Sequence, residues 1–363
     1  MLAVLSLCAW SYLFFAHGFF WRSRPQLSIA APEALPDIDI IVPARDEAQT
    51  VRAAIASLLS QEYAGKFRIF LIDDNSTDGT AARAGTSPHL QVIRLDSKPA
   101  GWSGKLWALH EGMAASRAPI VLFTDADIVH QPAHLASLLA KLLHGELDLV
   151  SEMVRLNCES LAERLLVPAF VYFFQMLYPF AKVNSPRSTV AAAAGGTVLV
   201  RRAALERIGG IAAIKDALID DVALAREIKR GGPIFLAHSE LAVSIRRYPR
   251  FADIWHMISR TAFTQLRYSP WMLLATIAAL TVIWLVPPWE VVFGSGWRFA
   301  CAVATCGLAA SSYIPTLIRY RRNKLGALAL PLIALFYMAA TTASAVNYWR
   351  GKGASWKNRA YSR

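Results

Sequence analysis

Apolar stretches long enough to cross a bilayer stand at both ends of this chain. Four such runs occur, at about residues 2–20, 271–289, 298–317 and 326–348. A helix of about 20 apolar residues spans the hydrocarbon core of a membrane. The sequence therefore predicts an N-terminal transmembrane anchor over residues 1–21 and a C-terminal transmembrane region over residues 271–349.

Basic residues beside these runs bear on their orientation. Two arginines in segment 21–25 follow the first run and favour an inside location for its C-terminal end. A cleaved signal peptide is the alternative, but no basic segment precedes the run and no small-residue cleavage site follows it. The loop 319–324 carries four basic residues and the tail 350–363 carries five, so both favour the cytoplasmic side. A single span between them conflicts with this, which leaves open a re-entrant last segment or an earlier segment on the surface.

The net charge of +12, in a chain that is 55% hydrophobic, favours anionic lipid or a phosphorylated substrate as a partner. Nucleic acid is not expected, because the basic residues cluster beside the apolar runs and no basic strand with interleaved aromatics is present. The four cysteines show neither a disulfide framework nor a zinc spacing.

Between residues 30 and 248, short apolar runs alternate with amphipathic stretches. The strand candidates are residues 38–42, 67–72, 91–95 and 120–124. Strands separated by helices imply βαβ units, so we expect an α/β domain with a Rossmann-like, mostly parallel sheet over residues 30–248. Ligands of such sheets bind outside the carboxyl ends of the strands.

Two polar turns follow the first two strand candidates, and both lead into helices. They read Pro43-Ala44-Arg45-Asp46-Glu47 and Asp73-Asp74-Asn75-Ser76-Thr77-Asp78-Gly79-Thr80. Carboxylates in such turns accept hydrogen bonds from ribose hydroxyls or a base N–H, and a helix N-terminus supplies donors. The same residue types commonly form turns and cap helices, so position alone supports both readings.

Two pairs of acidic residues are candidates for metal binding and catalysis. Asp125 and Asp127 directly follow the fourth strand candidate, and hard oxygen ligands of this kind suit Mg²⁺ or Mn²⁺ bound together with substrate phosphates. Asp220 and Asp221 open an amphipathic helix, where one carboxylate could take the proton of an acceptor hydroxyl. Acidic residues in a first helical turn also complement the helix dipole without any catalytic duty.

Basic residues suited to a diphosphate occur in two further places. Lys105 ends the turn Gly101-Trp102-Ser103-Gly104-Lys105, which precedes a helix and could bring its ammonium to a phosphate. Segment 246–267 holds five arginines and Asp253 as its single acid. We expect an interfacial amphipathic segment over residues 249–270, whose arginines could hold a leaving diphosphate or lipid headgroups.

Taken in order, these motifs resemble the family 2 inverting glycosyltransferases, which have a GT-A fold. The resemblance covers residues 37–232. It rests on the two polar turns, Gly104-Lys105, Asp125-Ala126-Asp127, Gly195-Gly196-Thr197 with Arg201-Arg202, and Asp220-Asp221.

Carried over position by position, the resemblance implies four sets of residues. Nucleotide-sugar contacts fall on Pro43, Ala44, Arg45, Glu47, Asp73, Asp74, Lys105 and Asp125. Asp127, with Asp125, would hold Mg²⁺ or Mn²⁺ and the diphosphate. Contacts with acceptor and diphosphate fall on Gly196, Thr197, Arg260 and Arg267. Asp221 would be the catalytic base, with Asp220 beside it where the family more often has Glu.

The chain departs from the family near the membrane. Many relatives carry a Gln-x-x-Arg-Trp motif, whereas the nearest matches here, residues 257–261 and 264–268, do not keep it. This departure disfavours a processive polysaccharide synthase. His110 stands where many relatives have Asn. The order of anchor, family 2 domain and short membrane region is also similar to the bacterial hopene-associated glycosyltransferases, through residues 101–105 and 255–270.

The resemblance implies a metal-dependent, multi-pass enzyme of the bacterial inner membrane with a cytoplasmic catalytic domain. Such an enzyme would move a sugar from a nucleotide-sugar donor, expected to be a UDP-sugar, to a membrane lipid such as a hopanoid. Two alternatives remain open: a polyprenyl phosphate or glycan acceptor, and a non-catalytic nucleotide-binding membrane protein. The oligomeric state is not indicated.

Overall fold

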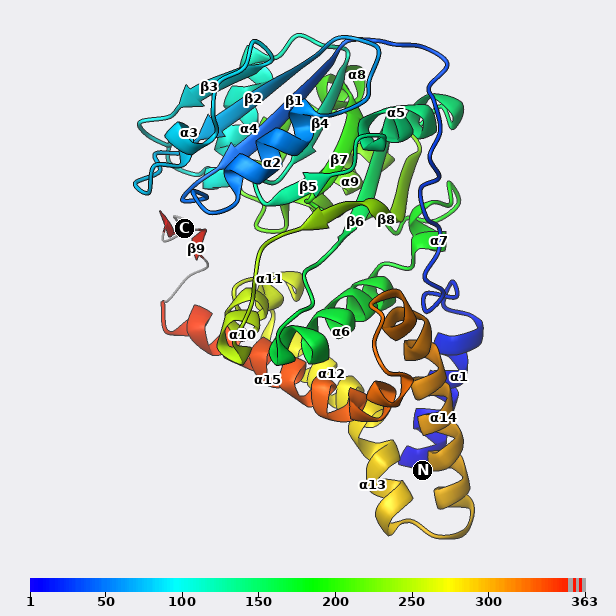
Figure 1. Cartoon of the computed structure of the whole chain (residues 1–363). Coiled ribbons are helices and arrows are strands. Elements are labelled where there is room, and N and C mark those ends of the chain that lie inside the picture. Colours follow the sequence, from blue (N-terminus) through cyan, green and yellow to red (C-terminus); the bar gives the residue numbers. More distant parts are fainter. Residues whose placement is uncertain (352–354, 357–358, 361–363) are drawn as a thin grey trace. The chain divides into compact units, whose positions relative to one another are not determined.

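The computed structural model describes residues 1–351, 355–356 and 359–360 (Figure 1). Within these residues the chain forms two compact units. The helical unit contains Met1–Ser23, Cys158–Ala181 and residues 248–351, and the sheet unit contains Arg24–Asn157 and Lys182–Arg247. Most of the expected basic tail 350–363 lies outside the described residues. The described part of this tail includes two short strands, β9 (Ser355–Trp356) and β10 (Arg359–Ala360), which pair antiparallel.

The sheet unit is built on one sheet of eight strands in the described part of the chain. Its strands are β1 (Ile38–Ala44), β2 (Phe67–Asp73), β3 (Leu90–Arg94), β4 (Ile120–Thr124), β5 (Ile128–His130), β6 (Leu149–Arg155), β7 (Thr197–Arg201) and β8 (Ile234–Ser244). Their order is β3-β2-β1-β4-β7-β6-β8-β5. Parallel pairing joins β3, β2, β1 and β4, while β7 runs antiparallel to both of its neighbours. The mostly parallel sheet expected from the sequence is confirmed.

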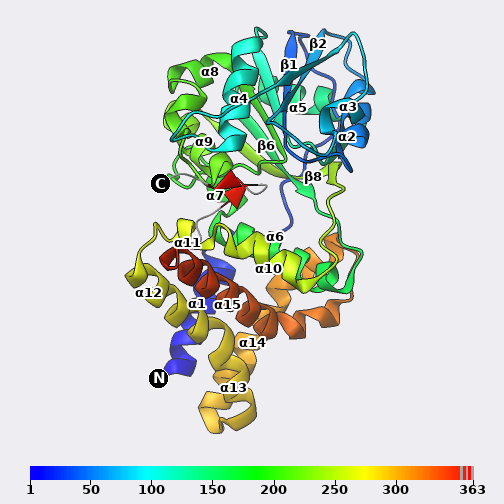
Figure 2. The same cartoon turned by 90° about the vertical axis from the view of Figure 1, so that its left-hand side faces the viewer.

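Helices cover both faces of this sheet because its central strands are apolar on both sides. They are α2 (Val51–Leu59), α3 (Thr80–Arg83), α4 (Gly104–Ala115), α5 (His134–His144), α8 (Arg202–Arg207), η1 (Ile211–Ile214) and α9 (Asp220–Lys229). Figure 2 shows α4 and α9 on one side of the sheet and α2 and α5 on the other. Gly112 lets α4 pack closely on β1, since a Cβ there would lie 2.4 Å from Ile41 Cγ2.

The helical unit contains the apolar C-terminal part of the chain. Its elements are α1 (Leu2–Phe15), α6 (Leu161–Leu177), α10 (Phe251–Ser259), α11 (Ala262–Gln265), α12 (Pro270–Leu280), the π-helical turn η2 (Thr281–Leu285), α13 (Val286–Phe293), α14 (Gly296–Arg319), η3 (Lys324–Ala329) and α15 (Leu330–Trp349). The short helix α7 (Phe180–Val183) lies where the chain passes between the units. Within the described residues, three helical stretches are long and apolar enough to cross a membrane: Pro270–Phe293, Gly296–Arg319 and Lys324–Trp349. They coincide with the three expected C-terminal runs.

The N-terminal helix is shorter than the expected anchor over residues 1–21. Helix α1 has 14 residues, or about 21 Å at 1.5 Å per residue, against a hydrocarbon core of about 30 Å. The helix ends at Phe15, and the chain then turns at Gly18 and Phe19, which both have positive φ. The Trp21 indole then donates back to the Phe14 carbonyl at 2.9 Å. Within its unit α1 packs along α14 (Figure 1).

Residues Cys158–Ala181 fall inside the expected domain 30–248, yet they pack in the helical unit. Helix α6 accounts for this: it begins with a capping box between Ser160 and Glu163 and turns an aromatic face toward α14. On that face Tyr172 is buried, and its hydroxyl lies 2.6 Å from Ser312 Oγ. The sequence motifs flank this helix, so motif order alone did not reveal that it interrupts the α/β domain.

Candidate active site

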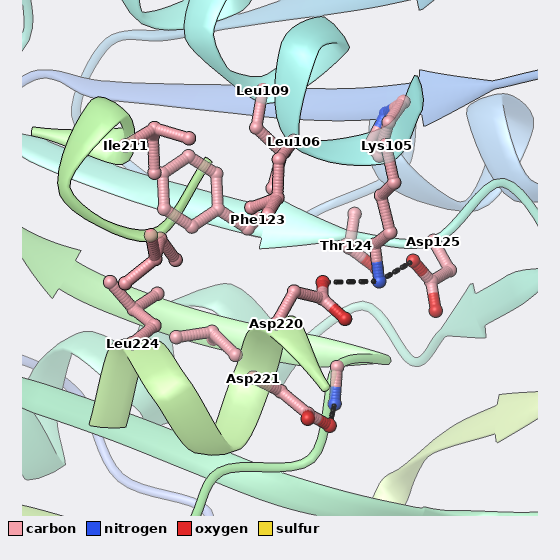
Figure 3. Close-up of a pocket in the computed structure, with 14 residues that line it drawn as sticks. Lys105, Leu106, Leu109, Phe123, Thr124, Asp125, Ile211, Asp220, Asp221 and Leu224 are labelled. Atoms are coloured by element: carbon pink, nitrogen blue, oxygen red, sulfur yellow. Dashed lines mark hydrogen bonds and ion pairs between the residues drawn. The ribbon is translucent and has the colours of Figure 1, made fainter. Parts of the chain in front are cut away.

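A small pocket lies at the carboxyl edge of β1 and β4, where ligands of parallel sheets bind. Strand ends, the N-terminus of α4, the loop before β7, η1 and the start of α9 all contribute to it (Figure 3). Its wall is mostly apolar, with Leu106, Leu109, Phe123 and Leu224 among the lining residues. The cavity measures about 20 Å³, close to the space of a single water molecule.

Lys105 closes this pocket by joining two carboxylates. Ser103 caps α4 by accepting a hydrogen bond from the Leu106 amide at 3.2 Å, which places Lys105 in the first turn of the helix. Its Nζ lies 2.9 Å from Asp125 Oδ1 and 3.1 Å from Asp220 Oδ2 (Figure 3). Burial lowers the pKa of Lys105, but the surrounding carboxylates outweigh it and raise the pKa overall. The ammonium thus stays charged and links the β4 edge to α9.

Asp221 is the carboxylate best suited to proton transfer. Its Oδ2 accepts from the Gly195 amide and its Oδ1 from the Val222 amide, both at 2.8 Å. Burial, together with the neighbouring charge of Asp220, raises the pKa of Asp221 to about 7. A general base works best with a pKa near the operating pH. The geometry therefore gives Asp221 the properties of a base at neutral pH.

Asp125 and Asp127 come from one motif but have different surroundings. Asp125 is partly exposed and forms an ion pair with Lys105. Burial raises the pKa of Asp125, and the charge of Asp127 adds to the shift. Asp127 is largely buried, and its Oδ2 accepts from Arg246 Nε at 2.8 Å and from Ser244 Oγ at 3.2 Å. Arg246 also forms an ion pair with Glu47. Asp127 is thus already held by the end of β8.

The two polar turns after β1 and β2 lie side by side, because Ala44 pairs in register with Asp73. Asp73 Oδ1 accepts from the backbone amide of Ser76 at 3.2 Å, and the Ser76 hydroxyl also donates to this oxygen. Asp74 is fully buried, and its carboxylate lies 3.5 Å from Arg45 Nη1. In this arrangement Asp74 holds Arg45, and Asp73 shapes its own turn.

Comparison with known proteins agrees with this geometry. Residues 39–209 match the family described as Glycosyl transferase family 2. Over this segment the chain is similar to the family 2 glycosyltransferases. The match ends before Asp220 and Asp221, so the geometry described above carries the case for these two residues.

Similar proteins support the same domain. Glucosyl-3-phosphoglycerate synthase of Mycolicibacterium paratuberculosis is 32% identical over 130 residues, which cover 34% of this chain and 40% of that protein. Beta-monoglucosyldiacylglycerol synthase of Nostoc sp. is 32% identical over 99 residues, 26% of this chain and 21% of that protein. This chain thus spans less than half the length of either relative. The solved structure of a mannosyltransferase from Pyrobaculum calidifontis in complex with GDP-Man and Mn²⁺ aligns with a TM-score of 0.58 at 22% identity, over 97% of this chain and 100% of that one. The expected GT-A fold is confirmed.

The acidic groups of the matched segment fit a divalent ion that is shared with a substrate. Among the described residues, no group of three or more His, Cys, Asp or Glu side chains could hold a metal. Mg²⁺ and Mn²⁺ are commonly bound by one or two carboxylates together with substrate phosphates and water. Asp125 meets this need best, since 35% of its side-chain surface is accessible against 9% for Asp127.

The remaining expected contacts divide into those the structure brings to the site and those it leaves elsewhere. Pro43 lines the pocket, whereas Thr197 is fully buried and donates to the Gly196 carbonyl at 2.8 Å. Arg260 and Arg267 belong to the helical unit, so their contact with the diphosphate stays a prediction.

Sequence reasoning missed several polar residues of this region. Arg246 was only one of five arginines in a segment expected at the membrane, and its link to Asp127 comes from β8 folding back beside β5. Thr124 stands directly before Asp125, and His130 and His134 follow at a spacing of four. That spacing was visible in the sequence, but nothing in it pointed to Thr124.

Proposed function

We propose that this chain is an inverting glycosyltransferase that moves a sugar from a nucleotide-sugar donor to the hydroxyl group of a membrane lipid. The arrangement around Lys105 carries this proposal. One ammonium joins Asp125, on the edge where the diphosphate of a donor would lie, to Asp220, which adjoins the candidate base Asp221. Donor and acceptor groups would therefore meet at this pocket.

The donor side is supported by the fold and by the charges at the sheet edge. A protein of the same fold was solved with GDP-Man and Mn²⁺, so a nucleotide sugar suits this architecture. For this chain we take a UDP-sugar as the first donor to test. Arg45 and Lys105 would contact its phosphates, because guanidinium and ammonium groups bind such oxygens strongly.

A divalent ion would be held by Asp125, with Asp127 as a second ligand once it releases Arg246. Bound there, Mg²⁺ or Mn²⁺ would neutralise the charge that grows on the diphosphate as it leaves. The partly accessible carboxylate of Asp125 supports this placement.

Asp221 supplies the proton transfer. Its carboxylate takes the proton of the acceptor hydroxyl while that oxygen bonds to the anomeric carbon and the bond to the diphosphate breaks. A single displacement inverts the anomeric carbon and forms no covalent intermediate with the enzyme. With a pKa of about 7, Asp221 is ionised in a large fraction of molecules at neutral pH and still binds a proton well. A phosphate acceptor would need no such base, so Asp221 favours a hydroxyl acceptor.

The apolar helices favour a lipid as the acceptor. Among the described residues, three of them are long enough to cross a membrane. One similar protein is named as a synthase of a glucosylated lipid, monoglucosyldiacylglycerol. We propose a hopanoid alcohol as the particular lipid, in a bacterial inner membrane with the sheet unit on the cytoplasmic side. The basic residues at 22–24 and 319–324 support that orientation.

A transfer assay tests this function directly. The purified chain in detergent would be incubated with Mn²⁺, radiolabelled UDP- and GDP-sugars, and either hopanoid alcohols, diacylglycerol or polyprenyl phosphate, each with an EDTA control. We expect label in an organic-soluble product of a hydroxyl lipid, and none with EDTA. Label only in polyprenyl phosphate would replace the acceptor class. Nucleotide binding without transfer from any donor would overturn the enzyme proposal.

A further inference from the structure

A chain of buried polar side chains runs through the sheet unit behind the pocket. It joins five residues that are each at most 3% exposed: Thr124, His130, His134, Glu152 and Ser239. These residues come from β4, β5, α5, β6 and β8, so the contacts extend from the middle of the sheet to its β5 edge. The function proposed above uses none of them.

Each contact in this chain has hydrogen-bond length. Thr124 Oγ1 lies 3.0 Å from His130 Nε2, and the two histidines meet through their Nδ1 atoms at 2.8 Å. His134 Nε2 lies 2.6 Å from Glu152 Oε2, which also accepts from Ser239 Oγ at 2.8 Å. The two imidazole rings are stacked, with centroids 5.0 Å apart. The contacts therefore form one continuous network.

The direction of the hydrogen bonds follows from the Gly196 carbonyl, which can only accept. Thr124 Oγ1 lies 2.8 Å from the Gly196 carbonyl and must donate its proton there. Its oxygen then accepts from His130 Nε2, which leaves His130 Nδ1 to accept from His134 Nδ1. Burial lowers the pKa of His130 well below its usual value, which agrees with a neutral imidazole that donates on one side and accepts on the other. His130 is thus held in one tautomer.

The network ends at the loop that holds the candidate base. Gly196 receives the Thr124 hydroxyl, and the amide of the preceding Gly195 donates to Asp221 Oδ2 at 2.8 Å. Both glycines are tightly placed: a Cβ on Gly195 would lie 3.1 Å from Lys105 Nζ, and one on Gly196 would lie 3.1 Å from Val154. A shift of this loop would move the partner of Asp221.

We propose that His130, supported by His134 and Glu152, is a positioning residue for Asp221, acting through Thr124 and the Gly195-Gly196 loop. The inference rests on the proposed function in one respect, namely that Asp221 is the catalytic base. Burying polar side chains costs desolvation, and the hydrogen bonds between them fix one arrangement. Glu152 Oε1 has no hydrogen-bond partner in the described part of the chain, so the fixed geometry comes from the contacts of Thr124, His130, His134 and Glu152 Oε2. These contacts end on the loop beside Asp221, so the arrangement they fix is that of the pocket.

Two substitutions of His130 separate its two hydrogen bonds. In His130→Gln the side-chain amide reaches the place of Nε2 and keeps the bond to Thr124, while His130→Asn reaches only the place of Nδ1 and keeps the bond to His134. We expect His130→Asn to lower kcat about 30-fold with the KM for donor within about twofold, since small misplacements of reacting groups cost this much. His130→Gln should restore most of that loss.

Thr124→Val tests whether the effect passes through the threonine. It should lower kcat as His130→Asn does, and the double variant should lose little more, because residues acting in one network are not additive. His144→Asn, on the exposed end of α5, is the matched control and should leave kcat and KM at wild-type values. Thermal unfolding and nucleotide binding would confirm that each variant is folded.

Amide hydrogen exchange at Gly195 and Gly196 gives a readout that does not depend on transfer. Exchange should be faster in His130→Asn than in wild type and close to wild type in His130→Gln. Equal loss of kcat in both variants, or unchanged exchange in His130→Asn, would overturn the positioning role. Wild-type protein that transfers no sugar would instead defeat the proposed function, and the exchange rates would still decide whether His130 fixes the loop.

Discussion

Two pairs of adjacent aspartates, Asp73-Asp74 and Asp220-Asp221, look alike in the sequence but have opposite surroundings. Asp74 is fully buried against Arg45, and Asp73 accepts from its own turn. Asp221 lines the pocket beside an apolar wall, and its pKa is raised to about 7. An acid that pairs with a buried arginine or with its own turn shapes the backbone. Asp221 also accepts two backbone hydrogen bonds, but burial and the charge of Asp220 outweigh them, so its pKa stays raised and it keeps its reactivity.

Asp221→Asn should produce the largest effect. The amide keeps the shape of the side chain but cannot take a proton, so we expect transfer to fall about 10³-fold, within the range for loss of a general base. Nucleotide binding should stay within about threefold of wild type, because the donor contacts lie at the other end of the Lys105 bridge. Initial rates and calorimetric titration with UDP would measure the two quantities.

The matched control for this variant is Asp216→Asn, in the exposed loop before α9. It removes the same charge four residues before Asp220 without touching the pocket, so its activity should equal that of wild type. Transfer that survives in Asp221→Asn would mean that the acceptor needs no base, as a phosphate acceptor would not.

Asp125→Ala and Asp127→Ala should differ within a single motif. Loss of the partly accessible Asp125 should weaken Mn²⁺ binding in the presence of UDP about 10²-fold, since few protein ligands hold such an ion. Asp127→Ala should weaken it less, because Asp127 is already held by Arg246 and Ser244. Electron paramagnetic resonance of Mn²⁺ measures both affinities. An equal loss in the two variants would show that the release of Arg246 costs the metal site no affinity, and that the two carboxylates contribute equally.

Asp74→Asn should affect stability more than catalysis. The substitution leaves Arg45 without its buried counter-charge, which we expect to cost about 1–3 kcal/mol of unfolding free energy. Donor affinity should fall only a few-fold, through looser placement of Arg45. Asp96→Asn, an exposed aspartate after β3, serves as the control for thermal unfolding. A loss of kcat with unchanged stability would instead place Asp74 in direct contact with the substrate.

The sequence was sufficient for the features that depend on chain order. The strands, the mostly parallel sheet and the three C-terminal apolar helices follow from hydrophobic pattern, because these elements bury apolar residues at regular spacing. The bridge from Lys105 to Asp125 and Asp220 could not be derived, since the three residues are brought together only by the packing of α4 and α9 on one face of the sheet. The early end of α1 was missed because Gly18 sits within a run that carries no charged residue.

The smallest predicted effect tests the raised pKa of Asp221 from the side of stability. Its pKa rises from 3.8 to about 7 on folding, so between these values the folded chain binds more protons than the unfolded chain. Stability therefore falls as pH rises through this window, and the ionised carboxylate costs the fold most above pH 7. Asp221→Asn carries no such charge and should unfold about 2–4 °C higher than wild type at pH 8, with the gain shrinking as pH falls toward 4. Scanning fluorimetry of both proteins across this range measures the difference, with Asp216→Asn expected to show none. A variant that is no more stable at pH 8 would mean that Lys105 compensates the Asp221 charge in full, and the contrast between the two aspartate pairs would then lie in geometry alone.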